Sequence, residues 1–457
     1  MTCTLEKIEG QKAIHHTTPG ATVNPCTLCA PLGAALVGAG IADTVPLLHG
    51  GQGCATYIRR YVISHFREPM DVASSSFGES QTVFGGEANL HRALDNIARQ
   101  YQPKLVTVAT TCVAETIGED VPQLLRAYLA KRGNGMSVVS ASTPSFKDGH
   151  VEGFHAMVRE VVAKFAEQRG PQTKAVTILP PILSPADLRH LKELAKAFDL
   201  NPIVLPDYSE TLDGVILDHY RPLPSGGTSL DDIAEMPRAC GTLDLTLTGI
   251  APPARTILES RGCTPTVLGL PIGVRAADRL CDTLAAAAGK DMPDWIANER
   301  GRLLDAYADG HKYVFGKRVG VYGDPEWVAG IARFLAEIGA RPVVCATGAR
   351  NRALRPALAD LPAGVVEEIL EDTDFGRIEA ACKDKHLDLL IGNSKGYRMS
   401  RELKVPLIRV GFPIHDRVGA NRQLLLGYRG TMALLDLIIN ALLEKKQADS
   451  PIGFSYL

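Results

Sequence analysis

Short apolar runs alternate with longer amphipathic stretches from about residue 174 onward. The short runs are rich in β-branched residues and predict strands, whereas the longer stretches repeat apolar residues every three or four positions and predict helices. Strands are expected at 174–182, 201–206 and 264–273, and helices at 185–198 and 275–289. This alternation is typical of parallel βαβ units.

A second series of the same kind follows a charged, helix-like stretch at 295–316. Strands are expected at 317–324, 341–348, 387–394 and 405–413, and helices at 325–339 and near 429–446. Because strand and helix alternate again, this part of the chain is predicted to be a separate doubly wound unit.

The first part of the chain, up to about residue 165, contains more Gly-rich loops, around a strand at 104–111 and a helix at 119–133. We therefore predict an α/β fold of three Rossmann-like parallel-sheet domains with helices on both faces. The predicted domains are 1–170 with the N-terminal segment, 171–310, and 311–457 with a C-terminal helix.

Composition and charge exclude several classes of partner. Hydrophobic residues make up 45% of the chain and charged residues 22%, as in folded globular proteins, and a formal net charge of -2 provides no positive field for nucleic acid. The apolar segment TMALLDLIINALL contains Asp436 and is too short for a bilayer, which needs about 20 residues. The N-terminus has no apolar signal region. We expect a cytoplasmic protein with neither a nucleic-acid nor a membrane partner.

Three of the ten cysteines stand in loop-like contexts flanked by Gly or Thr: Cys29 in NPCTLCAPLGAAL, Cys54 in LLHGGQGCATY and Cys112 in VTVATTCVAE. Cytosolic cysteines are kept reduced, so they serve as packing residues or as ligands. Cys112 directly follows a predicted strand, and ligands of doubly wound sheets bind outside the carboxyl ends of strands. A helix beginning there would also stabilise its thiolate.

Glycines surround Cys54, at Gly50, Gly51 and Gly53. They would let the backbone approach a bulky cluster and present N–H groups to its sulfides. A glycine-rich turn around a buried cysteine explains this composition equally well. Cys26 forms a C-x-x-C pair with the cysteine three positions later, but zinc needs a second such pair. We expect Cys26 to pack or to support the site rather than to bind metal.

Two histidines close to these cysteines, His49 and His65, invite interpretation as ligands. We expect both to be structural residues with satisfied hydrogen bonds. The turns VYGDPE and LLIGNSKG lack the glycine patterns of nucleotide-binding loops, so no nucleotide site is expected on this chain.

Several blocks of the sequence resemble the nitrogenase component 1 superfamily, specifically its β-type subunit. They are NPCTLCAPLGAAL, PLLHGGQGCATYIRRYVISHFREP, SSSFGESQTVFGG, VTVATTCVAETIGED, STPSFKDGHVEG, LLIGNSKG and VPLIRVGFPIHDR. The separations of 25 positions from Cys29 to Cys54 and 58 positions from Cys54 to Cys112 also resemble those of catalytic β subunits. Cofactor-assembly scaffolds of the corresponding type usually lack the full trio.

The resemblance implies that Cys29, Cys54 and Cys112, in the first predicted domain, bind iron of a P-cluster-type [8Fe-7S] cluster at a subunit interface. An α-type partner would share this cluster and hold a complex iron–sulfur active-site cofactor, in an α2β2 heterotetramer. An ATP-dependent iron protein with a [4Fe-4S] cluster would dock on the complex. Phe84 matches the aromatic residue under that docking surface, and Tyr57 a residue between the two clusters. Ordinary packing explains both residues equally well at this point.

The chain departs from molybdenum-type β subunits at Gly149, where those subunits carry a serine that can bind the oxidised cluster. The three cysteines would then bind the oxidised cluster without the serine ligand, or Tyr57 or Cys26 would assist them. GGQGC and ASSS look like the vanadium and iron-only types, whereas HFREP and VFGG look like the molybdenum type. This mixture favours a divergent branch, and we expect methylthio-alkane reductase, which cleaves C–S bonds of small organosulfur compounds. A dinitrogenase β subunit of nitrogen fixation and a cofactor-assembly scaffold subunit are the alternatives.

Overall fold

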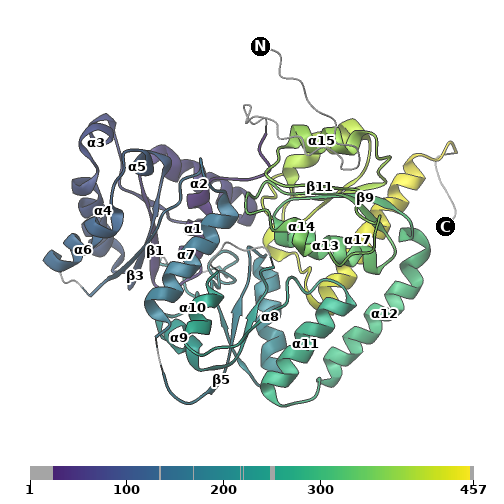
Figure 1. The fold of residues 1–457 in the computed structure, drawn as a ribbon, viewed down its shortest axis with the longest axis horizontal. Helices are drawn as coiled ribbons and strands as arrows, with labels where there is room; N and C mark the ends of the chain where they lie inside the picture. Colours follow the sequence, from purple (N-terminus) through teal and green to yellow (C-terminus); the bar gives the residue numbers. More distant parts are fainter. Residues whose placement is uncertain are drawn as a thin grey trace, which may run out of the picture.

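The computed structural model describes residues 24–132, 135–167, 169–216, 218–219, 221–247 and 253–452. Three sheets, each with only parallel pairings, form the framework, and helices cover them (Figure 1). The predicted α/β fold with parallel-sheet domains is therefore confirmed.

The first sheet has the strand order β2-β1-β3-β4. Its strands are β1 (Thr44–His49), β2 (Ala73–Ser74), β3 (Leu105–Thr110) and β4 (Ser137–Ala141). Its helices are α1 (Ala30–Ala39), α2 (Gln52–Phe66), α3 (Glu79–Phe84), α4 (Glu87–Tyr101), α5 (Cys112–Thr116), α6 (Val121–Arg132) and α7 (His150–Phe165). Every residue of β1 and β3 is buried. Successive side chains point to opposite faces, so Val45 and Leu47 pack in one apolar cluster and Leu48 in another.

The second sheet has the order β6-β5-β7-β8. Its strands are β5 (Thr173–Leu179), β6 (Asn201–Val204), β7 (Ala239–Asp244) and β8 (Pro265–Val267), with helices α8 (Pro185–Ala197), α9 (Leu230–Glu235), α10 (Arg255–Ser260) and α11 (Val274–Ala288) and the short 3₁₀ helix η1 (Met236–Arg238). Four of the five predicted elements match closely. The strand expected at 264–273 is shorter, because Gly269 takes a positive φ of 70° and turns the chain.

The third sheet has the order β11-β10-β9-β12-β13. Its strands are β9 (Arg318–Tyr322), β10 (Arg341–Ala346), β11 (Glu368–Leu370), β12 (Leu389–Gly392) and β13 (Leu407–Arg409). Its helices are α12 (Asp294–Val314), α13 (Pro325–Glu337), α14 (Leu354–Ala357), α15 (Phe375–Lys383), α16 (Tyr397–Leu403) and α17 (Gly427–Ala448), with η2 (Ser394–Gly396) and η3 (Ala420–Arg422). The predicted division into 1–170, 171–310 and 311–457 stays a prediction; residue 311 lies inside α12.

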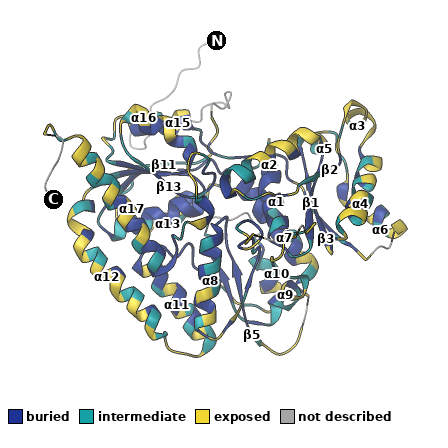
Figure 2. Ribbon diagram, turned by 180° about the vertical axis from the view of Figure 1, so that it is seen from behind, coloured by how far each residue is buried: buried dark blue, intermediate teal, exposed yellow. Residues whose placement is uncertain are grey.

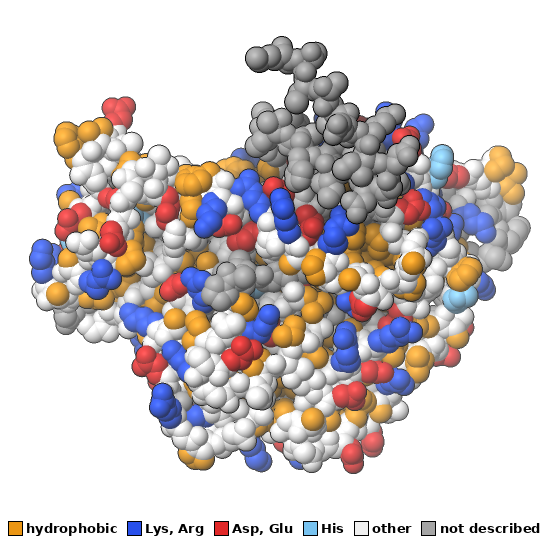
Figure 3. All heavy atoms as spheres, viewed as in Figure 1, with side chains coloured by type: hydrophobic (Ala, Val, Ile, Leu, Met, Phe, Trp, Pro, Cys, Tyr) orange, Lys and Arg blue, Asp and Glu red, His pale blue; other side chains and the backbone are white. Residues whose placement is uncertain are grey.

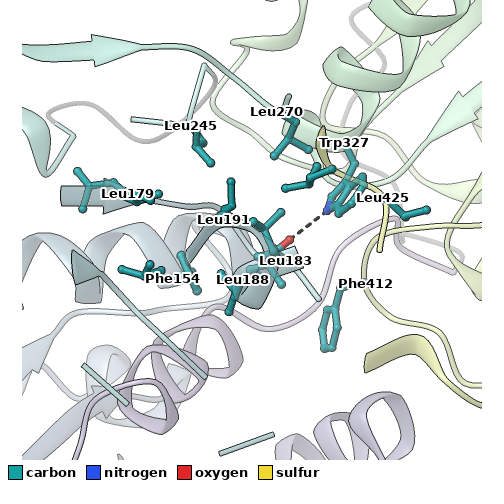
Figure 4. Packing of buried hydrophobic residues seen from close by; sticks show 14 of the residues in the cluster. Phe154, Leu179, Leu183, Leu188, Leu191, Leu245, Leu270, Trp327, Phe412 and Leu425 are labelled. Atoms are coloured by element: carbon teal, nitrogen blue, oxygen red, sulfur yellow. Dashed lines mark hydrogen bonds between the residues drawn. The ribbon is translucent and has the colours of Figure 1, made fainter. Parts of the chain in front are cut away.

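The three sheets share one apolar core. A single cluster of buried side chains extends from Leu28 to Ile438 and includes residues of all three sheets. Within this cluster, Trp327 of α13 connects the third sheet to the second. Its indole N–H donates to the carbonyl of Ile182, which lies between β5 and α8, at 3.0 Å (Figure 4). Below, each sheet with its helices is called a unit. The outward faces of α11, α12 and α17 remain exposed at the periphery (Figure 2). Across the described ranges, no helix combines the length and apolarity needed to cross a membrane.

The segment before α1 crosses from the third unit to the first. Pro25 forms an antiparallel bridge with Asp374, and the N–H of Phe375 donates to the carbonyl of Asn24 at 3.1 Å. A Cβ at Gly348, after β10, would collide with the backbone of Cys26, so the two chains lie in direct contact. The residues leading to Cys29 are therefore fixed by the third sheet.

Candidate cluster-binding site

Cys29 lies at the N-cap of α1, where α1 packs closely against α7. Glycine makes this approach possible, because a Cβ at Gly33 would collide with the carbonyl oxygen of His150, and one at Gly153 with that of Ala30. The contact brings the two helix N-termini together, and Cys29 forms an antiparallel bridge with Gly149, the N-cap of α7.

Gly149 stands where the resemblance places a serine. A Cβ there would collide with the Thr27 hydroxyl, which lies 3.2 Å from Nδ1 of His150. The carboxylate of Glu152 accepts the N–H of Gly149 at 3.0 Å. Thr27 therefore fills the space that a side chain at position 149 would need.

Cys54 and Cys112 approach from the first sheet. Cys54 lies in the first turn of α2 and is exposed, whereas Cys112 begins α5 directly after β3 and is half-buried. Because β1 and β3 are parallel neighbours with His49 opposite Thr110, the loops that follow them leave the same edge of the sheet side by side.

Cys29 and Cys112 lie close enough to Cys54 to affect the pKa of its thiol. Burial raises the pKa of the Cys54 thiol, and negative charge on Cys29 or on Cys112 raises it further. The structure therefore brings together the three thiols that the sequence singled out. Within the described part of the chain, no three Cys, His, Asp or Glu side chains are placed to hold a single metal ion. Ligands of one ion lie close together, with metal–sulfur bonds of about 2.3 Å, whereas the irons of a cluster can accept more widely spaced thiolates.

The glycines near Cys54 differ in their surroundings. A Cβ at Gly50 would collide with the side chain of Thr111, so this glycine permits the contact between the two cysteine loops rather than an approach to a cluster. A Cβ at Gly53 would meet no atom within 4 Å, and one at Gly51 only the carbonyl of Phe77 at 3.9 Å. The side of the loop that carries Cys54 is thus open, which fits a bulky group bound by these thiols.

The other candidate residues lie in two different settings. Tyr57 is 46% exposed on α2, and its hydroxyl donates to that of Tyr61 at 2.8 Å; burial, followed by this hydrogen bond, raises its pKa to about 12. Phe84 is 87% exposed at the end of α3. Its interpretation as a core residue is therefore wrong. Val83 beside it is also exposed, and hydrophobic side chains lie at this end of the molecule (Figure 3).

Cys26 does not face the open site. It is 3% exposed in an apolar cluster with Tyr322 and Val344, and burial raises its pKa to about 12. Lys395 lies close by, and its ammonium group donates to the carbonyl of Pro25. The geometry thus matches a packing function for Cys26.

Both histidines near the cysteines have hydrogen-bond partners. His49 lies 2.5 Å from Glu119 and 3.1 Å from Ser75, and Nδ1 of His65 accepts the N–H of Ile414 at 2.9 Å. The prediction of structural histidines agrees with these contacts. The sequence reasoning missed Glu119, and it also missed His150, whose spacing gives no signal because its partners are distant in the chain.

A cavity of about 770 Å³ lies at the carboxyl ends of β3 and β4. Glu115, Glu119 and Glu152 are among its lining residues. Glu115 accepts hydrogen bonds from Thr110 and Ser142, and Glu152 accepts the N–H of Arg350 at 3.0 Å as well as the bond from α7 described above. These carboxylates are therefore already engaged in holding the loops together.

Within the described residues, three parallel sheets and the nearby thiols of Cys29, Cys54 and Cys112 define an α/β protein with a thiol-lined candidate site. The chain belongs to the nitrogenase component 1 family of oxidoreductases, because the family model described as "Nitrogenase component 1 type Oxidoreductase" matches residues 29–443.

Curated relatives are β chains. The chain is 35% identical over 436 residues to the nitrogenase molybdenum-iron protein beta chain of Methanothermobacter thermautotrophicus, which covers 93% of this chain and 95% of that protein. It is 35% identical to the corresponding chains of Clostridium pasteurianum over 429 residues, covering 93% of each, and of Klebsiella pneumoniae over 459 residues, covering 96% of this chain and 88% of that one. The chain is thus similar to a molybdenum-iron protein β subunit.

Solved structures agree with the sequence comparison. A chain of the structure "Nitrogenase Cp1 at pH 6.5" superimposes with a TM-score of 0.90 and 33% identity, covering 99% of this chain and 98% of that chain. A chain of "Nitrogenase Cp1 at pH 5" has a TM-score of 0.69 at 14% identity, with coverage of 97% and 94%, and shares the fold alone.

Proposed function

We propose that this chain is the electron-transferring β-type subunit of a nitrogenase-like reductase, and that Cys29, Cys54 and Cys112 bind one side of a P-cluster-type [8Fe-7S] cluster. The observation that carries the proposal is the convergence of these three thiols at an open face. When bound, such a cluster supplies electron storage and transfer. The chain contributes thiolate ligands, the closely packed N-termini of α1 and α7, and a rigid sheet edge.

An α-type partner completes the site in this proposal. Cys54, Tyr57 and Arg60 recur every three residues and are exposed on one face of α2. Residues spaced in this way share a helix face, so a partner that covers the cluster also covers these side chains. The partner would supply the remaining cysteines and the active-site cofactor, in an α2β2 assembly.

The second partner in this proposal is an ATP-dependent iron protein that carries a [4Fe-4S] cluster. The exposed pair Val83 and Phe84, named here the α3 tip, provides an apolar contact for it. Exposed aromatic groups of this kind are typical anchors of protein interfaces.

Cysteine variants test the ligand assignment. Cys54→Ala and Cys112→Ala should purify with much less iron and lose reductase activity. The matched control is Cys240→Ala in β7, because its thiol donates to the carbonyl of Ala175 at 3.2 Å within the second sheet. Iron content equal to that of the wild type in both Cys54→Ala and Cys112→Ala would overturn the assignment.

For the reaction we propose reduction of the C–S bond of methylthio-alkanes in the partner's active site. Dimethyl sulfide, for example, takes up two electrons and two protons and gives methane and methanethiol. The departure at Gly149 supports a branch distinct from molybdenum-type subunits, since Thr27 fills the space of the serine. The relatives above are named as nitrogenase chains rather than as assembly scaffolds, so the scaffold alternative is not favoured.

The substrate is tested on the anaerobically purified complex with its iron protein and MgATP, supplied in parallel with dimethyl sulfide and with dinitrogen. Methane without ammonia supports C–S reduction. Ammonia as the main product assigns the chain to a dinitrogenase and overturns the organosulfur proposal. If an iron-containing complex forms neither product, both the organosulfur and the dinitrogenase interpretations are overturned, and the scaffold alternative is favoured.

A further inference from the structure

A buried histidine–carboxylate pair lies between the α3 tip and the loops of Cys54 and Cys112. Nε2 of His49 and a carboxylate oxygen of Glu119 are 2.5 Å apart, and the side chain of His49 is completely buried. His49 is the last residue of β1, and Glu119 lies between α5 and α6. Each residue also contacts one of the two regions that the pair separates.

Glu119 holds the α3 tip. Its second carboxylate oxygen accepts the N–H of Gly86, two residues after Phe84 and at the N-cap of α4. A Cβ at Gly86 would collide with the ring of Phe77, which packs edge-on against His49 at a centroid distance of 4.9 Å. The tip is therefore connected to the pair both by a hydrogen bond and by aromatic packing.

His49 holds both cysteine loops. Its Nδ1 lies 3.1 Å from the hydroxyl of Ser75, and this hydroxyl accepts the N–H of Gly50 at 2.9 Å. The backbone carbonyl of His49 accepts two hydrogen bonds from Thr111, one from its N–H at 3.1 Å and one from its hydroxyl at 3.2 Å. Gly50 leads to Cys54, and Thr111 directly precedes Cys112. One residue thus connects the two loops that carry thiols.

The protonation of the pair follows from its surroundings. Burial lowers the pKa of His49, with Glu119 acting in the opposite direction. A neutral imidazole that donates from Nε2 to Glu119 can accept the hydroxyl proton of Ser75 at Nδ1. Glu119 then accepts two N–H groups, one from His49 and one from Gly86, and the carboxylate satisfies both.

We propose that His49 and Glu119 are positioning residues that couple docking at the α3 tip to the positions of Cys54 and Cys112. This inference rests on the proposed function, in which the iron protein docks at that tip and the cysteines bind the cluster. Coupling between two sites is reciprocal: a docked partner changes the redox equilibrium of the cluster, and the redox state changes the docking affinity by the same factor. Factors of roughly 5 to 150 are usual for such coupling.

The experiment uses the purified α/β complex and its iron protein, held docked by a non-hydrolysable ATP analogue. The docking Kd is measured with the cluster oxidised and reduced, and amide hydrogen exchange is followed in residues 47–57 with and without the docked partner. The variants are Glu119→Ala and the isosteric Glu119→Gln. The control is Glu115→Ala, because Glu115 lines the same cavity but bonds to Thr110 and Ser142 instead of His49 and Gly86.

In the wild type and in Glu115→Ala, docking is expected to protect residues 47–57, and the two redox states to differ about fivefold or more in docking Kd. Glu119→Ala should retain its iron while the ratio falls to about one and the protection is lost. Glu119→Gln keeps one acceptor oxygen and should give an intermediate ratio. If Glu119→Ala does not fold, Glu119→Gln decides.

A wild-type ratio and wild-type protection in the Glu119 variants that fold would overturn the coupling inference while leaving the proposed function in place. A wild-type complex that lacks iron, or does not bind the iron protein, would overturn the proposed function instead. The two failures are therefore distinguishable.

Discussion

Cys29 and Cys54 reach the same site from loops with different supports. The loop of Cys29 depends on two sheets: Nδ1 of His150 accepts the N–H of Leu28 at 3.2 Å, while Nε2 lies 3.0 Å from Asp324, at the end of β9 in the third sheet. The loop that leads into Cys54, from Gly50, is held by the His49 network of the first sheet. Both supports are buried histidine–carboxylate pairs.

The two pairs differ in which parts of the protein they connect, and this difference predicts different effects on stability and on docking. The His150–Asp324 contact joins α7 to the residue before α13, so it connects parts of the chain that are distant in sequence. The His49–Glu119 contact lies within one unit and is connected to an exposed tip. The His150–Asp324 contact should therefore affect mainly the stability of the chain. The His49–Glu119 contact should affect how docking at the α3 tip changes the loop of Cys54.

The largest expected effect is at the helix contact beneath Cys29. Gly33→Ala places a methyl group against the carbonyl of His150 and the N–H of Phe154, which are backbone atoms that cannot rotate away. Overpacking of this kind costs about 3 kcal/mol of unfolding free energy. Thermal or denaturant unfolding of the purified chain should show this loss, and iron content should fall because Cys29 moves.

The matched control is Gly301→Ala in α12. A Cβ there meets no atom within 4 Å, so alanine should raise the unfolding free energy by up to about 1 kcal/mol through its higher helix propensity. Equal stability of Gly33→Ala and the wild type would contradict the close contact between α1 and α7.

The second expected effect separates the two histidine pairs. Asp324→Ala removes the carboxyl group that lies 3.0 Å from Nε2 of the buried His150, which should cost about 1 kcal/mol of unfolding free energy. Hydrogen exchange should increase in residues 26–32 and remain unchanged in residues 47–57. Glu119→Ala should show the reverse distribution. Increased exchange in both segments for either variant would show that the supports are not independent.

The sequence predicted the α/β class and most elements because hydrophobic periodicity is local information. It also singled out Cys29, Cys54 and Cys112 as candidate ligands from their loop contexts and spacing, and their binding of a cluster stays a prediction. The pairing of His150 with Asp324 was out of reach, since it depends on how the third sheet packs against α7. Likewise, the exposure of Phe84 depends on α3 projecting from the sheet rather than on its local residues.

The third expected effect is a pH dependence at His65, where α2 meets the third unit. Burial lowers the pKa of His65 to about 3, below its unfolded value of about 6.5. Between these values the unfolded chain binds the proton and the folded chain does not, so stability falls as pH drops below about 6.5. The slope from this residue is about 1.4 kcal/mol per pH unit.

His65→Gln should remove this slope, because glutamine keeps an acceptor for the N–H of Ile414 and does not titrate. Unfolding measured from pH 6 to pH 4.5 tests the prediction. His155→Gln is a parallel case, since burial lowers the pKa of His155 to about 4. An unchanged pH slope in His65→Gln would mean that His65 is already protonated in the folded chain.

The smallest expected effect on stability is at the α3 tip, and it isolates function from folding. Phe84 is 87% exposed, so Phe84→Ala should change the unfolding free energy by less than about 0.5 kcal/mol. Burial of a phenylalanine in an interface is worth about 1.5–3 kcal/mol, so the same variant should weaken iron-protein docking roughly 10- to 150-fold. Phe315→Ala, at an exposed phenylalanine in the third unit, should leave docking unchanged. Equal docking of Phe84→Ala and the wild type would show that the α3 tip is not part of the docking surface. Docking would then have no connection through the α3 tip to the loop of Cys54, and the proposed difference between this loop and that of Cys29 would lose its functional reason.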